Sequence, residues 1–394
     1  MKRLIIFLVV LTSSINFCSA QWQQTSGPGS GYNILSIVNS GSKIFAGTNG
    51  GGMFISTNNG QTWSTVSGTA NAWVYSFAVN GSTIFAGAGG TIFLSTDNGN
   101  NWNSVGNGLP NAAITSIVIK GINIFAGTYS GGIYLSTDNG SNWLPLNNGL
   151  TSQYVTSIAI SGQNIFAGTY GGGIFLSSDS GSNWTAINNG LSNSGISSLV
   201  ISGTNIFAGA DGNMFISNNN GGNWTSITNG LIPFVLSLYS CGTSIFAGTQ
   251  GGGVFQSIDS GSNWTAVNTG LVANANIYAF TNNSTYLFIG TSGTNVWKRS
   301  LSDFGVNTGV NTISISNNDF TVYPNPFFSA CSFQFNAELK DAELVIYNLL
   351  GNEIMRKLFS GNNLEIERGN LERGVYFVSV NDNKRQYIEK IVVE

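Results

Sequence analysis

The chain has 394 residues, of which 52 are glycine, 8% are charged and none is histidine. Soluble domains usually carry about 25% charged residues, and here residues 21–303 hold only four basic residues, six aspartates and no glutamate, whereas residues 319–394 have an ordinary charge density. The net charge of -3 without a basic cluster excludes electrostatic binding of nucleic acid, and the absence of histidine excludes a Ser-His-Asp triad or a histidine metal site, so we expect no metal and no cofactor.

The first 20 residues have the pattern of a secretory signal peptide. A basic start and an apolar run over 4–11 precede a predicted cleavage between Ala20 and Gln21. A spanning helix needs roughly 20 apolar residues, so no transmembrane segment is predicted. Lipid attachment at Cys18 is an alternative, but the bulky residue before it does not fit a lipoprotein signal. We expect an exported protein.

Residues 21–303 contain a sequence repeat with a period of roughly 40 residues. Ile-Phe-Ala-Gly begins at positions 44, 84, 124, 165, 206 and 245, with a weaker copy at 287. Each of the first six copies is followed by Ser-x-Asp/Asn-x-Gly-x-Asn/Thr-Trp. The acidic or amide residues of these motifs are Asn58, Asp97, Asp138, Asp179, Asn219 and Asp259, and the tryptophans are Trp63, Trp102, Trp143, Trp184, Trp224 and Trp264. The pattern resembles the Asp-box, or BNR repeat, of sialidase-like β-propellers.

Each repeat predicts four short strands joined by Gly- and Asn-rich turns. In the third repeat the predicted strands are 114–119, 123–128, 132–136 and 142–146. Four strands per repeat of this length is the spacing of a propeller blade. The seventh repeat stops after three strands, and residues 21–24 resemble the missing fourth. We therefore predict an all-β fold with a seven-bladed β-propeller over residues 21–303, closed by its N-terminal strand.

The Asp-box motif predicts a structural turn in the hairpin between the third and fourth strands. An Asp or Asn oxygen can accept backbone N–H groups there, and glycine takes the positive φ. Asn58 and Asn219 replace aspartate in two copies, so the negative charge is dispensable. A ligand or calcium site is the alternative interpretation.

An enzyme is disfavoured by the residues that the propeller lacks. In the sialidases that this repeat resembles, three arginines hold the substrate carboxylate and a Tyr/Glu pair acts as the nucleophile. Residues 21–303 contain one arginine, Arg299, and no glutamate. Other glycosidases need two carboxylates about 5–9.5 Å apart. Outside the Asp-boxes only Asp211 and Asp303 remain, and the repeat places them on opposite faces. We predict a non-catalytic protein, and a glycosidase with an unorthodox site is the less favoured alternative.

Aromatic residues gather on the face that we call the upper face, which carries the turns between second and third strands and the connections between blades. The candidate ligand contacts are Trp73, Tyr75, Tyr129, Tyr154, Tyr170 and Phe234. Aromatic rings beside amides suit neutral sugar rings. The sequence thus favours binding of neutral polysaccharide. Packing of these rings between blades, and a protein-binding or architectural surface component, remain alternatives.

Residues 304–318 are predicted to be a linker, and residues 319–394 a separate small domain. Short alternating runs between Gly and Asn turns predict an antiparallel β-sandwich. Cys241 and Cys331 fall in different domains, so no internal disulfide is expected.

Four motifs in this last segment, in order, resemble the type A C-terminal sorting domain of type IX secretion substrates in Bacteroidota. They include Tyr323, Pro324, Asn325, Pro326, Gly351, Gly374, Tyr376 and Lys390. The resemblance implies an Ig-like sandwich that engages the type IX secretion machinery and is then usually removed. The cargo would be released or attached to surface lipopolysaccharide. A generic accessory β-domain is the alternative.

Overall fold

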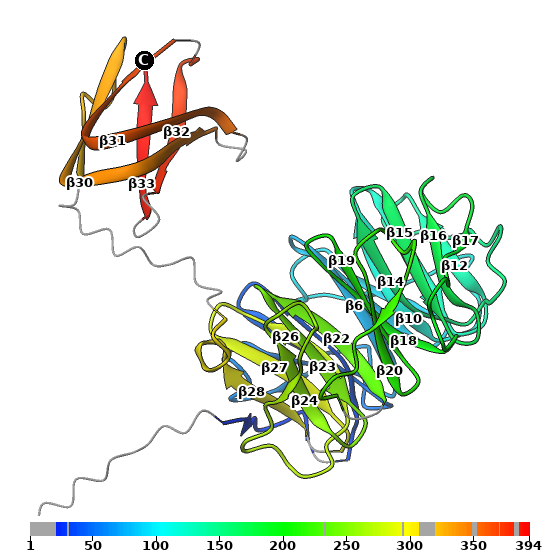
Figure 1. The fold of residues 1–394 in the computed structure, drawn as a ribbon. Helices are drawn as coiled ribbons and strands as arrows, with labels where there is room; N and C mark the ends of the chain where they lie inside the picture. The colour runs from blue at the N-terminus through cyan, green and yellow to red at the C-terminus, as the bar shows by residue number, and fades with distance from the viewer. Residues whose placement is uncertain are drawn as a thin grey trace, which may run out of the picture. The chain divides into compact units, whose positions relative to one another are not determined.

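The computed structural model describes residues 21–29, 31–231, 234–293, 295–306, 320–348, 353–369, 371–381 and 386–394. The predicted signal peptide and Gly351 lie outside these ranges. The chain divides into two compact units between residues 308 and 309, and both consist of β-strands (Figure 1). Within the described ranges, no helix has the length and apolar character needed to cross a membrane.

The first unit is built from seven four-stranded antiparallel sheets, which we number in chain order. Sheet 1 contains β2 (Ile34–Ser40), β3 (Lys43–Thr48), β4 (Met53–Ser56) and β5 (Ser64–Thr65), and sheet 2 contains β6 (Val74–Asn80), β7 (Thr83–Ala88), β8 (Ile92–Ser95) and β9 (Asn103–Val105). Sheet 3 contains β10 (Ile114–Lys120), β11 (Asn123–Thr128), β12 (Gly132–Ser136) and β13 (Leu144–Pro145), and sheet 4 contains β14 (Val155–Ser161), β15 (Asn164–Thr169), β16 (Gly173–Ser177) and β17 (Thr185–Ala186).

Sheet 5 contains β18 (Ile196–Ser202), β19 (Asn205–Ala210), β20 (Asn213–Ser217) and β21 (Thr225–Ser226), and sheet 6 contains β22 (Val235–Cys241), β23 (Ser244–Thr249), β24 (Gly253–Ser257) and β25 (Thr265–Ala266). Sheet 7 contains β26 (Ile277–Asn282), β27 (Tyr286–Thr291), β28 (Val296–Ser300) and β1 (Gln23–Gln24). The first three strands predicted for the third repeat begin where β10, β11 and β12 begin, whereas the fourth shortens to two residues.

The Ile-Phe-Ala-Gly motif forms the second strand of the first six sheets, and the small residues in it allow neighbouring sheets to approach closely. A Cβ at Gly47 in sheet 1 would lie 2.7 Å from the carbonyl oxygen of Val74 in sheet 2. The adjacent Ile44, Phe45 and Ala46 are fully buried. Burial on both faces explains why this strand is a continuous apolar run rather than an alternating one.

The seven sheets form a closed ring. The first strand of each sheet contacts the first strand of the next, and β26 of sheet 7 contacts β2 of sheet 1. The N-terminal strand β1 pairs with β28, with Gln23 opposite Lys298. Residues 21–24 therefore supply the outer strand that the seventh repeat lacks.

Packing of the first unit continues past residue 303, where the sequence predicted a linker to begin. A short 3-10 helix, η1 (Leu301–Phe304), follows β28, and both Phe304 and Val306 are buried. The Phe304 ring makes an edge contact with Phe246 at 5.1 Å. Burial of these apolar side chains against sheets 6 and 7 explains why this segment is packed rather than extended.

The second unit contains β29 (Phe320–Tyr323), β30 (Ala330–Tyr347), β31 (Glu353–Glu367), β32 (Gly374–Asn381) and β33 (Gln386–Val393). The strand order is β29-β30-β32-β33, and β31 also pairs with β30. Its core includes Phe333, Leu344 and Ile391. Cys331 is buried here and Cys241 is buried in sheet 6, and both are free thiols.

Candidate functional site

The upper face is organised by a backbone contact that recurs from sheet to sheet. The residue after the second strand donates its N–H to the carbonyl of the residue that precedes the first strand of the same sheet. In sheet 4, Tyr170 donates to Tyr154 at 2.9 Å, and in sheet 6, Gln250 donates to Phe234 at 2.9 Å. This pairing places two variable side chains of each sheet next to one another on the upper face.

Five of the six predicted aromatic contacts come together across sheets 2, 3 and 4. We call Trp73, Tyr75, Tyr129, Tyr154 and Tyr170 the aromatic rim. The ring centroids are 6.2 Å apart for Trp73 and Tyr75, 3.9 Å apart for Tyr129 and Tyr154, and 5.4 Å apart for Tyr154 and Tyr170. Trp73, Tyr129 and Tyr170 are 50%, 50% and 57% exposed. The aromatic rim thus consists of two groups of partly exposed rings, the Trp73–Tyr75 pair in sheet 2 and the set of three tyrosines in sheets 3 and 4.

Two hydroxyl groups of the rim, those of Tyr75 and Tyr154, have raised pKa values. Burial is the largest cause that raises the pKa of Tyr75 and of Tyr154 above the ordinary tyrosine value, and the neighbouring Tyr129 raises both further. Tyr75 and Tyr154 thus present uncharged rings with hydrogen-bonding hydroxyls.

An open pocket of about 460 Å³ lies beside the rim in sheet 2. It is lined by Asn71, Ala72, Trp73, Tyr75, Ala88, Gly89 and Thr91. The Trp73 ring also lies close to the backbone of sheet 1, since a Cβ at Gly50 would be 3.3 Å from its Nε1. Amide, hydroxyl and aromatic groups therefore converge in one concave surface.

Phe234, the sixth predicted contact, lies apart from the rim in sheet 6. It is 47% exposed and has a positive φ of 67°. No aromatic contact with another described residue joins it to the five rim residues. The repeat register already indicates this separation, because Phe234 falls in the sixth repeat and the other five residues fall in repeats two to four.

The two carboxylates outside the motifs occupy different environments. Asp303 pairs with Arg299 at 3.3 Å beside η1. Asp211 lies in the turn between β19 and β20, where its N–H donates to Gly195. Asp211 is thus on the upper face and Asp303 follows a third strand, at the opposite end of the strands.

The hairpin between the third and fourth strands, here the outer hairpin, is held by a repeated hydrogen-bond network. In sheet 2, Ser95 Oγ donates to Asp97 Oδ1 at 2.8 Å, and the backbone N–H and side-chain amide of Asn101 donate to the two carboxylate oxygens at 2.9 and 2.6 Å. In sheet 1, Asn58 Oδ1 accepts the corresponding N–H of Thr62 at 2.9 Å. The side-chain amide oxygen of asparagine therefore accepts the same backbone N–H as the carboxylate oxygen of aspartate does.

These bonds set the ionisation of the hairpin carboxylates. Hydrogen bonds from Asn101, Asn142 and Asn183 lower the pKa of Asp97, Asp138 and Asp179 to about 2. The pKa of Asp259 is lowered for the same reason. All four carry a negative charge at neutral pH, and their hydrogen-bonding capacity is directed into the hairpin.

The tryptophans that end these motifs hydrogen-bond either to the preceding sheet or within their own hairpin. The indole N–H groups of Trp184, Trp224 and Trp264 donate to the carbonyls of Leu146, Ile187 and Ile227 in the preceding sheets, at 2.9, 2.7 and 3.2 Å. Trp102 and Trp143 instead donate to the carbonyls of Gly99 and Gly140 in their own hairpins, and Trp63 donates to the Thr25 hydroxyl.

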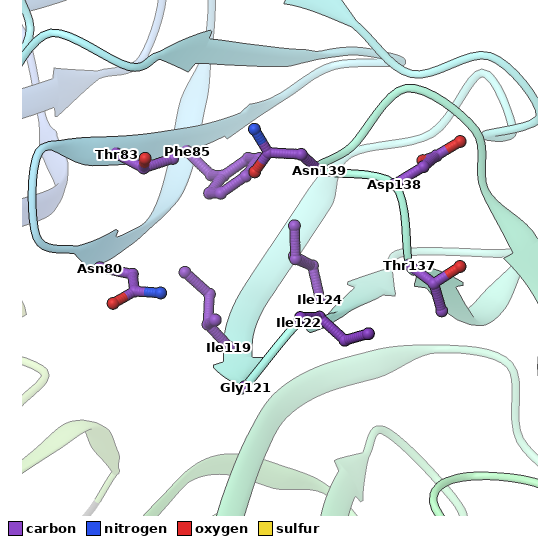
Figure 2. A pocket seen from close by; sticks show the side chains of 10 residues that line it. All are labelled: Asn80, Thr83, Phe85, Ile119, Gly121, Ile122, Ile124, Thr137, Asp138 and Asn139. Atoms are coloured by element: carbon purple, nitrogen blue, oxygen red, sulfur yellow. The ribbon is translucent and has the colours of Figure 1, made fainter.

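A second pocket, of about 370 Å³, opens between sheets 2 and 3 (Figure 2). It lies on the face opposite the upper face, where the turns between first and second strands and the outer hairpins are found. We call it the junction pocket. It is lined by Asn80, Thr83, Phe85, Ile119, Gly121, Ile122, Ile124, Thr137, Asp138 and Asn139. The repeat pattern did not predict this pocket. One sequence signal of it is Ile122, which is 77% exposed and occupies a turn position that is polar in the other repeats.

Family models match the C-terminal unit over nearly its whole length and the first unit in part. Residues 321–394 match the family model described as a secretion system C-terminal sorting domain. The C-terminal unit is therefore a secretion system C-terminal sorting domain. Residues 8–124 match the family model described as the DUF6242 beta propeller domain. The sorting domain implies type IX export to the outer surface or the medium.

Solved structures show the same propeller fold at low sequence identity. YCF48 from Cyanidioschyzon merolae is 17% identical, with a TM-score of 0.58 over 72% of this chain and 100% of YCF48. The WD40 beta propeller domain of Doa1 is 14% identical, with a TM-score of 0.58 over 70% of this chain and 96% of that domain. The extracellular domain of BT4673 from B. thetaiotaomicron is 15% identical, with a TM-score of 0.58 over 95% of this chain and 59% of that domain.

One curated relative is an endo-acting ulvan lyase from Formosa agariphila. It is 31% identical over 116 residues, which are 27% of this chain and 20% of the lyase. The chain thus matches about a fifth of that protein.

In the sorting domain, the predicted motif residues fall into a solvent-exposed group and a group that holds the last strand. Tyr323 is exposed, whereas the amide of Asn325 donates to the Lys390 carbonyl and accepts from the Val392 N–H, both at 2.8 Å. Asn325 therefore covers the free edge of β33. Tyr376 is buried, and its hydroxyl donates to the Glu372 carbonyl at 3.0 Å.

Proposed function

We propose that the exported chain is a non-catalytic binding protein whose propeller recognises neutral polysaccharide through the aromatic rim. The observation that carries this proposal is the contact of three tyrosine rings across sheets 3 and 4, with the half-exposed Trp73 and its partner Tyr75 in the adjacent sheet 2. Sugar rings offer apolar C–H faces and hydroxyl groups, which exposed aromatic rings and nearby amides complement without charge.

The architecture supports rim binding. We interpret each four-stranded sheet as one blade of a seven-bladed propeller over residues 21–303, and the outer hairpins as Asp-box turns that serve structure. The carboxylates of these hairpins are already satisfied by hydrogen bonds, which leaves them little capacity for a ligand. The rim, in contrast, exposes large rings that the fold does not bury.

The sorting domain supports display of this binding surface outside the cell. We interpret residues 319–394 as an Ig-like sandwich that engages the type IX secretion machinery, and residues 307–318, which follow the packed segment ending at Val306, as the connection to the propeller. The cargo would then be released or held at the surface.

The test is a panel of neutral polysaccharides, with ulvan included because of the partial lyase match, and the full exported chain as probe. We expect saturable binding to a neutral polymer without release of new chain ends. Release of reducing or unsaturated ends by the pure chain would contradict the non-catalytic part. Absence of binding to every polymer would contradict the carbohydrate part.

A protein partner is the second candidate, because one structural neighbour is YCF48 bound to D1 peptide, with a TM-score of 0.56. The same aromatic rim could contact a peptide. Capture of a surface protein by the full chain, lost on Trp73→Ala and insensitive to competing polysaccharide, would favour this candidate.

A further inference from the structure

The junction pocket lies where two neighbouring sheets meet, and two equivalent places between other sheets of the ring are closed by hydrogen bonds. At each junction, the turn between the first two strands of one sheet faces the outer hairpin of the next. Asn59, Asn98 and Asn139 occupy the same hairpin position in sheets 1, 2 and 3, with positive φ values of 55°, 57° and 58°. Their backbones thus present the same groups to the preceding sheet.

Between sheets 1 and 2, two side chains bridge this gap. Ser40 Oγ donates to Asn98 Oδ1 at 2.7 Å, and Lys43 Nζ donates to the Asn98 carbonyl oxygen at 3.0 Å. Lys43 Nζ also donates to Asn100 Oδ1 at 2.7 Å. A lysine ammonium and a second donor therefore satisfy both oxygens of the hairpin asparagine.

Between sheets 7 and 1, the same two oxygens are satisfied by a different pair of residues. Asn283 Nδ2 donates to Asn59 Oδ1 at 2.8 Å, and Lys298 Nζ donates to the Asn59 carbonyl oxygen at 2.9 Å. Lys298 comes from the third strand of its sheet, whereas Lys43 begins a second strand. Two lysines at non-equivalent positions therefore reach the same acceptor.

Between sheets 2 and 3, the bridge is missing. Asn80 and Thr83 stand where sheet 1 has Ser40 and Lys43, and the threonine lacks the reach of a lysine. No hydrogen bond to another described residue involves the side chain or the carbonyl oxygen of Asn139. The junction pocket occupies this gap, with the isoleucine side chains gathered between Asn80 and the hairpin (Figure 2).

We propose that the junction pocket binds the side-chain ammonium of a lysine from a partner polypeptide. The ammonium would donate to the Asn139 carbonyl oxygen, as Lys43 does to the Asn98 carbonyl oxygen at the neighbouring junction, and to the Asn139 amide oxygen, whose counterpart in Asn98 accepts from Ser40. The four methylene groups of the lysine would lie on Ile122 and Ile124, because long cationic side chains place their stems on apolar surface. Asp138 adds a negative charge to the lining of the pocket.

The remaining junctions do not offer this combination. The hairpin position is Ser180 in sheet 4 and Ser260 in sheet 6, so the side-chain amide oxygen is absent. Asn220 in sheet 5 follows Asn219, so the carboxylate is absent. The exposed isoleucine is also specific to the turn of sheet 3.

The test uses the full exported chain and the tripeptide acetyl-Gly-Lys-Gly-amide, with binding followed by NMR shifts of the Asn139 side-chain amide. We expect weak, saturable binding that falls at least roughly tenfold when the lysine is acetylated, since acetylation removes the charge. Thr83→Lys should fill the pocket from within and reduce peptide binding by a similar factor. Asn123→Lys is the matched control, because it adds a lysine at the same position of sheet 3 and leaves the pocket open.

Each other outcome overturns the proposal. Equal binding of the acetylated peptide would show that the ammonium is not recognised, and unchanged binding to Thr83→Lys would place the peptide elsewhere. Butylammonium that binds as tightly as the peptide would identify a free amine rather than a polypeptide as the ligand. The wild-type comparison of the two peptides requires no variant to fold.

Discussion

The indole N–H of Trp22 donates to the carbonyl oxygen of Val267 at 2.7 Å, across 245 positions of the sequence. The bond has the same form as the one from Trp264 to Ile227 between sheets 6 and 5. The Trp22 backbone N–H also donates to Thr269 at 2.8 Å. The N-terminal segment therefore replaces the outer tryptophan of sheet 7, and the ring is held closed by a contact between its two ends.

Closure predicts a large effect of Trp22→Ala on stability. The side chain is buried in the cluster that includes Phe246 and Phe304, and loss of a buried tryptophan costs about 3–5 kcal/mol. Denaturant unfolding should show a decrease in the free energy of unfolding of this size. Gln23→Ala, an exposed change in the same strand, is the control. Equal stability of both variants would contradict closure by this contact.

The hairpin carboxylates predict how stability depends on acid. Because folding lowers the pKa of Asp97, Asp138 and Asp179 to about 2 from an unfolded value of 3.8, their contribution is complete above about pH 4. It is lost as the pH falls toward 2. Thermal unfolding should therefore show a Tm that falls between pH 4 and 2.

A double variant tests the source of this acid dependence. Asp97→Asn with Asn101→Thr reproduces the pair that sheet 1 already uses, in which Asn58 Nδ2 donates to Thr62 at 2.9 Å. We expect a Tm near that of the wild type at neutral pH and a smaller fall between pH 4 and 2. An unchanged fall would exclude Asp97 as a contributor.

The close approach of neighbouring sheets predicts different tolerances at two nearby glycines. A Cβ at Gly87 would lie 2.8 Å from the Ile114 carbonyl oxygen, whereas a Cβ at Gly89 would meet nothing within 4 Å. Gly87→Ala should lower the free energy of unfolding by about 1–3 kcal/mol, since backbone must shift. Gly89→Ala should leave it nearly unchanged. Similar losses in both variants would refute this explanation.

Much of the strand pattern could be predicted from the repeat, because hydrophobic periodicity and turn residues recur at fixed spacing. The first three strands of sheet 3 and the pairing of residues 21–24 are examples. The burial of Phe304 could not be predicted, because it depends on a ring that another sheet presents. The grouping of five aromatics in neighbouring sheets and the separation of Phe234 followed from the register, but the ring contacts among Tyr129, Tyr154 and Tyr170 did not.

The junction pocket shows a further limit of sequence reasoning. It exists because Thr83 is shorter than the lysine at the same position of sheet 1, and because Ile122 lines the gap from sheet 3. Each difference is visible in the sequence. Their combined effect depends on the distance between two sheets, which the repeat alone does not give.

The low charge of the propeller predicts ligand binding that is insensitive to salt. Residues 21–303 contain few charged groups that could form ion pairs with a ligand. Salt, which weakens such ion pairs by screening, should therefore have little effect on the affinity. Affinity for a neutral polysaccharide should change less than about twofold between roughly 0.05 and 0.5 M sodium chloride. A steep loss of affinity in this range, measured by titration calorimetry, would contradict an uncharged site.

The most direct measurement is the affinity of the full exported chain, Trp73→Ala/Tyr154→Ala and Phe234→Ala for the polysaccharide that binds best in the panel. If the aromatic rim is the site, the double variant loses at least roughly 30-fold in affinity, since each stacked ring contributes about 1–3 kcal/mol, while Phe234→Ala binds like the wild type. Unchanged binding by a folded double variant would contradict the account, and the polysaccharide site would have to lie elsewhere on the propeller.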